Sequence, residues 1–425
     1  MTVMLLYIHV PFCRKKCAYC AFYSVLLVYG SGGNPGANMI QGYLSTLLGE
    51  LRLWGERLGK KPVETIFFGG GTPSLLPAKA IAGIISEVDK TFTIAPAVEI
   101  TVEANPESAL ADGWLFDVKK AGVNRLSLGV QSFNDAALAR LGRSHDSQTA
   151  EAAFHTARTA GFVNISLDFM WGLPGEPDRP QTQAHWLHQL KRVVELWPEH
   201  ISTYGLTLEE GSALAASCAG GALALPAESD LASMYLAGAD FLEGRGFMHY
   251  EVSNYTRIGF ECRHNLGYWQ GADYLGLGPA ATSTLGGRRW TNPSSASGWR
   301  TLVQDESIGN DAETLDAQSR LKELLMLRLR TSKGLSLQDY RACSGRSFQK
   351  DFGSLAELLQ KNGLAASRKG WFRLTRSGML VSDTILGHFF AGIEGVPPKP
   401  RQGHDAPAPP TIPIPPLALP VKGPA

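Results

Sequence analysis

The chain has 425 residues, of which 44% are hydrophobic, enough to bury a large core and to form two or three domains. Forty basic side chains against 39 acidic ones leave a net charge of +1, which excludes a bulk electrostatic field that would attract nucleic acid or an anionic membrane. No run of about 18 apolar residues occurs, so the sequence predicts no membrane-spanning helix.

The first segment, residues 1–11, is apolar and leads directly into a group of cysteines. It is too short for a signal peptide and has no basic flank, so we expect a buried strand. Three further cysteines, Cys218, Cys262 and Cys343, are scattered along the chain. This distribution does not suggest a disulfide framework, and it predicts a protein of the reducing cytoplasm.

Between residues 5 and 285, short runs rich in β-formers alternate with amphipathic helical stretches. The runs are 65–68, 98–102, 125–130, 165–170 and 200–206. This alternation predicts parallel βα units. The runs end in polar or glycine-rich segments, namely Gly69 to Thr72, Glu103, Gln131 and Gly172 to Pro174. Because the carboxyl ends of parallel barrel strands form the active face, we expect the functional residues there.

The remainder of the chain predicts a second unit and a tail. The first unit covers residues 1–310. The second covers 311–392 and reads as three helices followed by a hairpin, at 321–329, 335–344, 349–362 and 370–374. Residues 393–425 are dominated by proline and small residues, which cannot build a core, so we expect a disordered tail. A glycine-rich stretch at 30–38 predicts a mobile loop after the cysteine group.

The three grouped cysteines, Cys13, Cys17 and Cys20, have the spacing CxxxCxxC. Their thiolates can converge from one short loop onto an iron-sulfur cube, and a complete structural cluster would need a fourth thiolate. One iron is therefore left open for a further ligand, as the open position of a catalytic metal is. The alternatives are a Cys3His zinc site that uses His9, or cysteines that are merely buried.

Downstream segments supply further candidate ligand contacts. Glycines at 69–71 let backbone groups approach a ligand closely, although the same residues could form a simple tight turn. Glu103 ends the next strand, where its carboxylate could accept hydrogen bonds from hydroxyls or balance a positive charge, although it could also be a surface or capping residue.

The chain resembles the radical S-adenosylmethionine (SAM) superfamily, and within it the HemN/HemW branch of anaerobic coproporphyrinogen III dehydrogenases and haem chaperones. The resemblance runs from about Leu6 to His388. It is carried by YIHVPFCRKKCAYC, FFGGGTPS, VEANP, RLSLGVQSF, LGRSHD, DFMWGLPG, YEVSNY and HNLGYW. It implies an α/β fold, a partial (β/α) radical SAM barrel followed by a winged-helix-like α+β domain.

The resemblance also implies a 4Fe-4S cluster on the three cysteines and SAM on its open iron. The implied SAM contacts are Tyr7, Tyr19, Gly70, Gly71, Thr72, Glu103, Gln131, Arg143 and Asp168. Arg143 could fork onto the SAM carboxylate, whereas the two tyrosines could equally be packing residues. One electron, from a donor such as a flavodoxin or ferredoxin, would cleave SAM to methionine and a 5′-deoxyadenosyl radical.

Two features point to the chaperones within this branch. The dehydrogenases carry a cysteine two residues after the third ligand, where this chain has Phe22. The segment HNLGYW fits a pattern associated with haem handling, which makes His264 a candidate iron ligand and Tyr268 and Trp269 candidates to pack on a porphyrin. The alternative is a hydrogen-bonded core histidine. Ala21 departs from the acidic residue common in the chaperones, which puts fine tuning of the cluster in doubt.

Three functions remain open from the sequence. The first is a haem chaperone that passes haem to haem-requiring acceptor proteins, for which no catalytic residue is assigned. The second is an enzyme that decarboxylates coproporphyrinogen III to protoporphyrinogen IX. The third is a radical SAM enzyme for another substrate. The hairpin carries only a few basic residues, such as Arg368 and Arg373, so we do not expect nucleic-acid binding.

Overall fold

The computed structural model describes residues 3–27, 35–176 and 179–395. The chain divides into two compact units, Met1–Thr314 and Leu315–Ala425. The sequence places the start of the second unit at Asp311, whereas the strand β14 (Glu313–Thr314) pairs with β13 (Arg288–Thr291) and so still belongs to the first.

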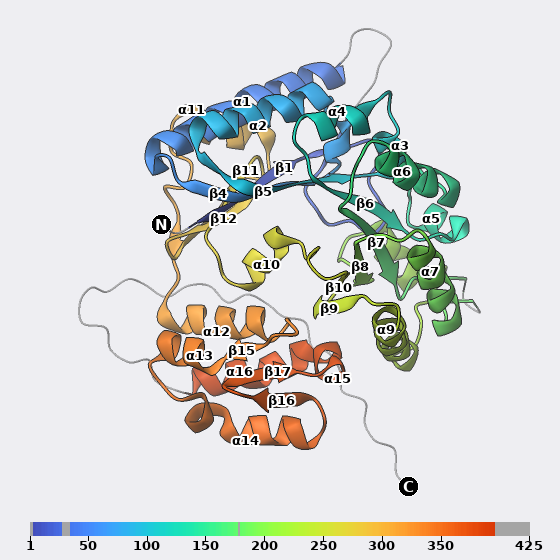
Figure 1. The fold of residues 1–425 in the computed structure, drawn as a ribbon, viewed down its shortest axis with the longest axis vertical. Helices are drawn as coiled ribbons and strands as arrows, with labels where there is room; N and C mark the ends of the chain where they lie inside the picture. The colour runs from blue at the N-terminus through green and yellow to red at the C-terminus, as the bar shows by residue number, and fades with distance from the viewer. Residues whose placement is uncertain (1–2, 28–34, 177–178, 396–425) are drawn as a thin grey trace. The chain divides into compact units, whose positions relative to one another are not determined.

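The N-terminal unit is built on a twelve-stranded sheet whose central strands are parallel. Figure 1 labels these central strands. The parallel strands, in sheet order, are β11 (Tyr274–Leu277), β1 (Met4–Val10), β4 (Pro62–Gly70), β5 (Thr93–Ala104), β6 (Arg125–Gln131), β7 (Ile165–Trp171) and β8 (His200–Gly205). Antiparallel strands extend both edges: β10 (Asn254–Thr256) and β9 (Met248–Glu251) beside β8, and β12 (Thr282–Leu285) with β13 and β14 beyond β11. The sheet has two edges, which is the arrangement of a partial barrel.

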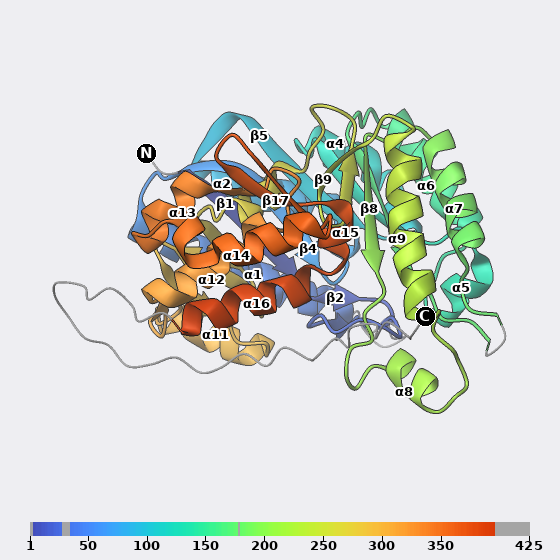
Figure 2. The same ribbon diagram turned by 90° about the horizontal axis from the view of Figure 1, so that it is seen from below.

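Helices connect the parallel strands and cover the sheet. They are α1 (Pro35–Leu58), α2 (Ala78–Thr91), α3 (Pro106–Ala109), α4 (Trp114–Lys120), α5 (Asp135–Arg140), α6 (Ser147–Thr159), α7 (Gln183–Glu195), α8 (Ala213–Ala219), α9 (Glu228–Glu243) and α11 (Ala296–Gln304). Side chains that accept from backbone N–H groups begin several of them, such as Asp146 at α6 and Thr182 at α7. Figure 2 shows α9 lying beside α7, and α1 packs between α2 and α11.

The side chains of the barrel strands alternate between two environments. On β6, Leu126, Leu128 and Val130 are buried in the apolar core under the helices. The intervening side chains, Arg125 and Ser127, line a cavity inside the barrel. Other strands contribute further buried polar residues, including Thr65, Glu99, Thr101, Ser166, His200 and Ser202. The barrel interior is therefore polar, and the site lies within it.

The C-terminal unit is a small α+β domain. Its helices are α12 (Ala317–Arg328), α13 (Leu337–Ser344), α14 (Phe348–Lys361), α15 (Arg376–Leu380) and α16 (Ser382–Glu394). Its sheet has the order β15 (Leu335–Ser336), β17 (Trp371–Leu374) and β16 (Ala365–Arg368), and β16 and β17 form the wing. Four phenylalanines and Tyr340 pack together in its core: Phe348, Phe352, Phe372 and Phe389.

The predicted fold class is confirmed. The predicted runs 65–68, 98–102, 125–130 and 165–170 lie within observed strands, and the run 200–206 extends one residue beyond β8. The predicted loop at 30–38 is wrong from residue 35 onward, where α1 begins with proline at a position that suits its fixed backbone angle; residues 30–34 lie outside the described residues. The predicted tail, 393–425, lies outside them too, except that 393 and 394 end α16 and Gly395 follows as its C-cap. Among the described residues, no helix is long and apolar enough to cross a membrane.

Candidate functional site

The loop that carries the three cysteines is fixed at its base and along its length. At the base, β2 (Phe12–Cys13) pairs with β3 (Val25–Leu26). Further along, the Ala18 N–H donates to the Leu141 carbonyl, and the Leu214 N–H donates to the Ala18 carbonyl. Gly142 has a φ of 74°, and a Cβ there would lie 3.3 Å from the Ala18 nitrogen. Glycine therefore allows the start of LGRSHD to approach the cysteine loop.

Two cysteine sulfurs have hydrogen-bond donors from other elements. The Thr72 hydroxyl lies 3.6 Å from Cys13 Sγ, and Arg143 Nη1 lies 3.4 Å from Cys17 Sγ. Burial raises the pKa of the Cys13 and Cys20 thiols, so their thiolates need positive charge nearby. An iron-sulfur cluster held by these thiolates would provide that charge.

The geometry also bears on the zinc alternative. Both ring nitrogens of His9 are engaged, Nδ1 with the Tyr7 hydroxyl at 3.2 Å and Nε2 with the Tyr23 carbonyl at 3.1 Å. Within the described ranges, no three His, Cys, Asp or Glu side chains are grouped closely enough to hold a single metal ion. The contacts of His9 give it a structural role beside the cysteine loop, and the three thiols remain the candidate cluster ligands.

The glycine segment at the end of β4 passes directly beneath this loop. The Gly71 N–H donates to the Val10 carbonyl and the Thr72 N–H to the Phe12 carbonyl, at 2.8 and 2.7 Å. A Cβ on Gly71 would lie 2.6 Å from the Phe12 oxygen, and one on Gly70, whose φ is 108°, would lie 2.5 Å from the His9 ring. No other residue fits at these two positions without displacing the backbone or His9.

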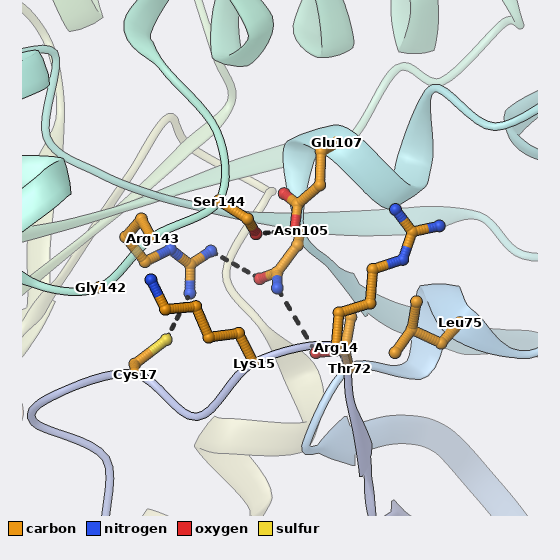
Figure 3. Close-up of a pocket in the computed structure, with 10 residues that line it drawn as sticks. All are labelled: Arg14, Lys15, Cys17, Thr72, Leu75, Asn105, Glu107, Gly142, Arg143 and Ser144. Atoms are coloured by element: carbon orange, nitrogen blue, oxygen red, sulfur yellow. Dashed lines mark hydrogen bonds between the residues drawn. The ribbon is translucent and has the colours of Figure 1, made fainter. Parts of the chain in front are cut away.

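Arg143 connects the cysteine loop with the ends of β5 and β6, and Figure 3 shows its hydrogen bonds to Cys17 and Asn105. Its Nη2 donates to Asn105 Oδ1 at 2.6 Å and to the Gly129 carbonyl at 2.8 Å, and Asn105 Nδ2 donates to the Thr72 hydroxyl at 3.4 Å. Gln131, at the end of β6, has a φ of 67° next to a register shift, and a Cβ on Gly129 would lie 3.0 Å from its Nε2. These residues therefore form one connected set at the strand ends.

Two carboxylates stand next to this set. Gly70 N–H donates to Glu103 Oε2 at 3.3 Å, while Asp168 accepts from the Ser127 hydroxyl at 2.9 Å and from the Ser166 hydroxyl at 3.0 Å. Burial and repulsion from Asp168 raise the pKa of Glu103 to about 8, and burial raises the pKa of Asp168. Carboxylates destabilised in this way favour a ligand that brings positive charge and hydroxyl donors.

A cavity of about 140 Å³ extends from this carboxylate pair into the barrel. It is lined by Tyr7, Phe67, Glu103, Arg125, Ser127, Asp168, Ser202, Tyr204, His264, Asn265 and Tyr268. Tyr19 does not line this cavity. It lies beside Arg143 and packs against the small apolar cluster that contains Leu141, Met170 and Leu214. Of the two tyrosines that the sequence nominates, Tyr7 therefore faces the cavity, and Tyr19 supports the cysteine loop.

The segment HNLGYW forms a short helix, α10 (Arg263–Trp269). Glu99 accepts hydrogen bonds from the Arg263 and His264 N–H groups, at 3.0 and 3.1 Å. The His264 ring is 1% exposed, its Nδ1 lies 2.7 Å from the Thr65 hydroxyl, and it stacks on Phe67 with 4.9 Å between ring centres.

Nε2 of His264 is buried and has no hydrogen-bond partner among the described residues. Burial lowers the pKa of His264 to about 3, so the ring is neutral near pH 7. Tyr268 contacts the ring edge-on, with 4.7 Å between ring centres, whereas Trp269 does not line the cavity. The structure thus brings His264 and Tyr268 together, with Trp269 at the end of the helix.

The sequence reasoning missed several residues that hold this site. Asn105, Ser127 and Ser166 position Arg143 and Asp168, and Glu99 fixes α10. Asn105 and Ser127 had a signal, because they lie in the motifs VEANP and RLSLGVQSF. Ser166 and Glu99 look ordinary until the strand register places them.

Comparison with known proteins gives two family matches and many full-length relatives. Residues 7–185 match the model of the radical SAM superfamily, and residues 315–381 match that of the HemN C-terminal domain. The proteins named heme chaperone HemW from Bacillus subtilis (strain 168) and Escherichia coli (strain K12) are 32% and 33% identical to this chain. The first alignment covers 90% of this chain and the second 91%, and each covers 98% of the relative.

Among solved structures, the chain is similar to coproporphyrinogen III oxidase (HemN) from Escherichia coli, described as a radical SAM enzyme. The TM-score is 0.73 at 22% identity, and the match covers 91% of this chain and 90% of the other. This similarity establishes the shared fold.

Proposed function

The chain belongs to the radical SAM superfamily and, within it, to the family of the HemW haem chaperones, and we propose that it binds haem and transfers it to haem-requiring acceptor proteins. The observation that carries this proposal is the identity of 32% to 34% with proteins named as haem chaperones, sustained over about nine-tenths of the chain. The position two residues after the third cysteine agrees, since Phe22 occupies it with 68% of its surface exposed and supplies no further thiolate.

Membership of the superfamily implies a 4Fe-4S cluster and SAM, and we assign the cluster to Cys13, Cys17 and Cys20. The hydrogen bonds from Thr72 and Arg143 to two of the sulfurs support this assignment. When bound, the cluster supplies one-electron chemistry to SAM through its open iron. The protein's part is to orient the two groups and to keep water from them.

For SAM, we propose a site formed at the ends of the parallel strands. Gly70, Gly71 and Thr72 would approach the amino acid part, and Arg143 would contact its carboxylate. Glu103 and Asp168 would accept from the ribose hydroxyls and balance the sulfonium charge, which is the role that their raised pKa values favour. Gln131 and Tyr7 would complete the walls, with Tyr19 supporting the loop.

For haem, we propose His264 as the iron ligand and Tyr268 as a porphyrin contact. A neutral imidazole with an unpartnered Nε2 is the form that ligates haem iron. Because the ring is buried against Phe67, ligation requires that α10 move so that Nε2 becomes accessible. Trp269, at the end of the same helix, would then be free to pack on the porphyrin.

The remaining parts of the proposal concern partners and location. We propose haem-requiring acceptor proteins and a one-electron donor such as a flavodoxin or ferredoxin as partners. All six cysteines are free in the structure, which suits a reducing compartment, and we propose the cytoplasm.

The test is anaerobic reconstitution with iron and sulfide, followed by two parallel assays on the same protein. Haem binding is measured by absorbance titration, and turnover of coproporphyrinogen III is measured with SAM and a reductant. Haem binding without turnover supports the chaperone. Formation of protoporphyrinogen IX would instead make the protein a decarboxylating dehydrogenase.

Substitution of His264 tests the assignment of the haem iron ligand separately from the chaperone function. We expect His264→Ala to lose the absorbance of the ligated haem, with His185→Ala, an exposed histidine on α7, as the matched control. Unchanged haem spectra in His264→Ala would move the iron ligand elsewhere and leave the chaperone proposal standing.

A further inference from the structure

The cysteine loop carries three consecutive cations between two of its cysteines. Arg14, Lys15 and Lys16 are all exposed, and none forms a hydrogen bond or an ion pair with any part of the chain that the structure describes. Arg14 and Lys15 stand at the rim of the pocket drawn in Figure 3. Its acidic residue, Glu107, is already engaged with Ser144 and His145.

The same loop exposes two large apolar side chains. Phe22 is 68% exposed and Leu26 is 50% exposed, on the segment that returns from Cys20 to β3. A single exposed apolar residue is ordinary, but here two lie within the loop that also holds the unpaired cations. Aromatic residues and arginine are enriched in protein interfaces, so this composition is typical of a contact surface.

The position of this surface indicates which kind of partner it can bind. The cations lie in the sequence between Cys13 and Cys17, and all three cysteines are partly exposed. A protein that contacts the cations is therefore adjacent to the cluster that we assign to these cysteines. The whole chain carries a net charge of only +1, so attraction of an acidic partner depends on this local group of charges.

We infer that Arg14, Lys15, Lys16, Phe22 and Leu26 form the docking surface for an acidic one-electron donor protein. This inference rests on the proposed cluster, and it adds the surface through which the cluster is reduced. One electron passes from the donor, which is oxidised, to the cluster, which is reduced, and no bond forms or breaks. A small surface with a charged rim suits such a partner, because electron-transfer complexes are transient and lie at the low end of interface sizes.

The test measures cluster reduction by two reductants in the reconstituted full-length protein. One is a fully reduced flavodoxin of net negative charge, and the other is dithionite, which needs no docking surface. The variant is the triple substitution Arg14→Gln, Lys15→Gln, Lys16→Gln. We expect its second-order rate constant with flavodoxin to fall about tenfold or more at low ionic strength, with a weaker salt dependence. The rate with dithionite, a small anion that needs no docking surface, should fall much less.

A matched triple variant controls for loss of net charge alone. Lys120→Gln, Lys191→Gln, Arg288→Gln removes three exposed cations from α4, α7 and β13 of the same unit and should keep the wild-type rate. Phe22→Ser tests the apolar part and should weaken flavodoxin binding without altering the salt dependence.

The outcomes separate this inference from the proposed function. Equal flavodoxin rates in the loop variant and the wild type would overturn the docking surface, and so would an equal loss in both triple variants. Absence of any reducible cluster in the wild type, with dithionite as well, would instead overturn the proposed cluster.

Discussion

The interiors of the two units are built from different side chains. Inside the barrel of the N-terminal unit lie Arg125, His200 and His264, each at most 2% exposed, together with the carboxylate of Glu99. The C-terminal unit instead buries phenylalanines around Phe348 and Phe389, with ring centres 6.0 Å apart. Apolar burial stabilises a fold, whereas buried ionisable groups cost stability unless they are paired.

The difference indicates that the barrel interior keeps buried polar groups at a cost in stability, and that these groups form the candidate ligand site. In the barrel, the polar side chains are held by hydrogen bonds that leave some atoms, such as His264 Nε2, without a partner among the described residues. In the C-terminal unit, Tyr340 has its hydroxyl on Asp351 at 2.7 Å and the rest of its ring in the apolar core. A polar interior suits a ligand site, and an apolar one suits a structural domain.

Removal of one cluster ligand is the strongest test of this difference between a ligand-binding N-terminal unit and a structural C-terminal unit. Cys13→Ala, Cys17→Ala and Cys20→Ala should each abolish the charge-transfer absorbance of the reconstituted cluster, because three thiolates leave no spare ligand. Cys343→Ala, an exposed cysteine of the C-terminal unit, is the control and should keep it. Absorbance retained in all three loop variants would contradict the assignment.

Truncation in the apolar core should cost stability and leave the ligand site intact. Phe372 is fully buried between Phe348 and Phe389, so Phe372→Ala should lower the free energy of unfolding of the C-terminal unit by about 3 to 5 kcal/mol. Leu358→Ala, at an exposed position, should change it by less than about 0.5 kcal/mol. Denaturant titration measures the free energy of unfolding of both variants. Loss of SAM binding in Phe372→Ala would contradict the separation of the C-terminal core from the ligand site.

The buried histidines should make the stability of the barrel depend on pH. Burial lowers the pKa of both His264 and His200, so the unfolded chain binds protons that the folded barrel does not. Their contribution is complete above about pH 6.5 and is lost as pH falls below it, by about 1.4 kcal/mol per pH unit for each histidine. Buried carboxyls such as Glu103, whose pKa is raised, change stability in the opposite direction over this range, so the histidine contribution is measured as the difference between the wild type and His264→Asn. Denaturant midpoints of both proteins at pH 7, 6 and 5 should differ less as pH falls, and a difference that does not change with pH would refute the expectation.

The smallest predicted effect concerns Glu103. Because its pKa is raised to about 8, the carboxyl is mostly protonated at pH 7 and ionises as pH rises to 9. SAM affinity should therefore increase over this range in the wild type and stay flat in Glu103→Gln, which should bind about tenfold more weakly at pH 9. Equilibrium binding of labelled SAM measures it, with Glu195→Gln on α7 as the control. A parallel pH profile in Glu103→Gln would exclude this role.

Much of the fold and part of the site could be predicted because they depend on local patterns. The alternation of apolar runs and amphipathic stretches gave the parallel strands, and each strand ended close to the residue where polarity returned, as at Glu103 and Gln131. The start of α1 at Pro35 was missed because glycines nearby resemble a loop. The antiparallel strands at both sheet edges were not foreseen, since short strands carry little periodicity.

By itself, the sequence determined the local chemistry of this protein. The spacing of Cys13, Cys17 and Cys20 places three thiols on one loop, and consecutive glycines at 69–71 allow a close backbone approach, because both depend only on neighbouring residues. Tertiary structure decided which distant groups meet. Arg143 lies 126 residues from the sulfur of Cys17, and Glu99 lies 165 residues from the His264 N–H that it accepts. Such contacts follow from strand order and register. A one-residue shift in register would turn the side chains of a strand to the opposite face of the sheet.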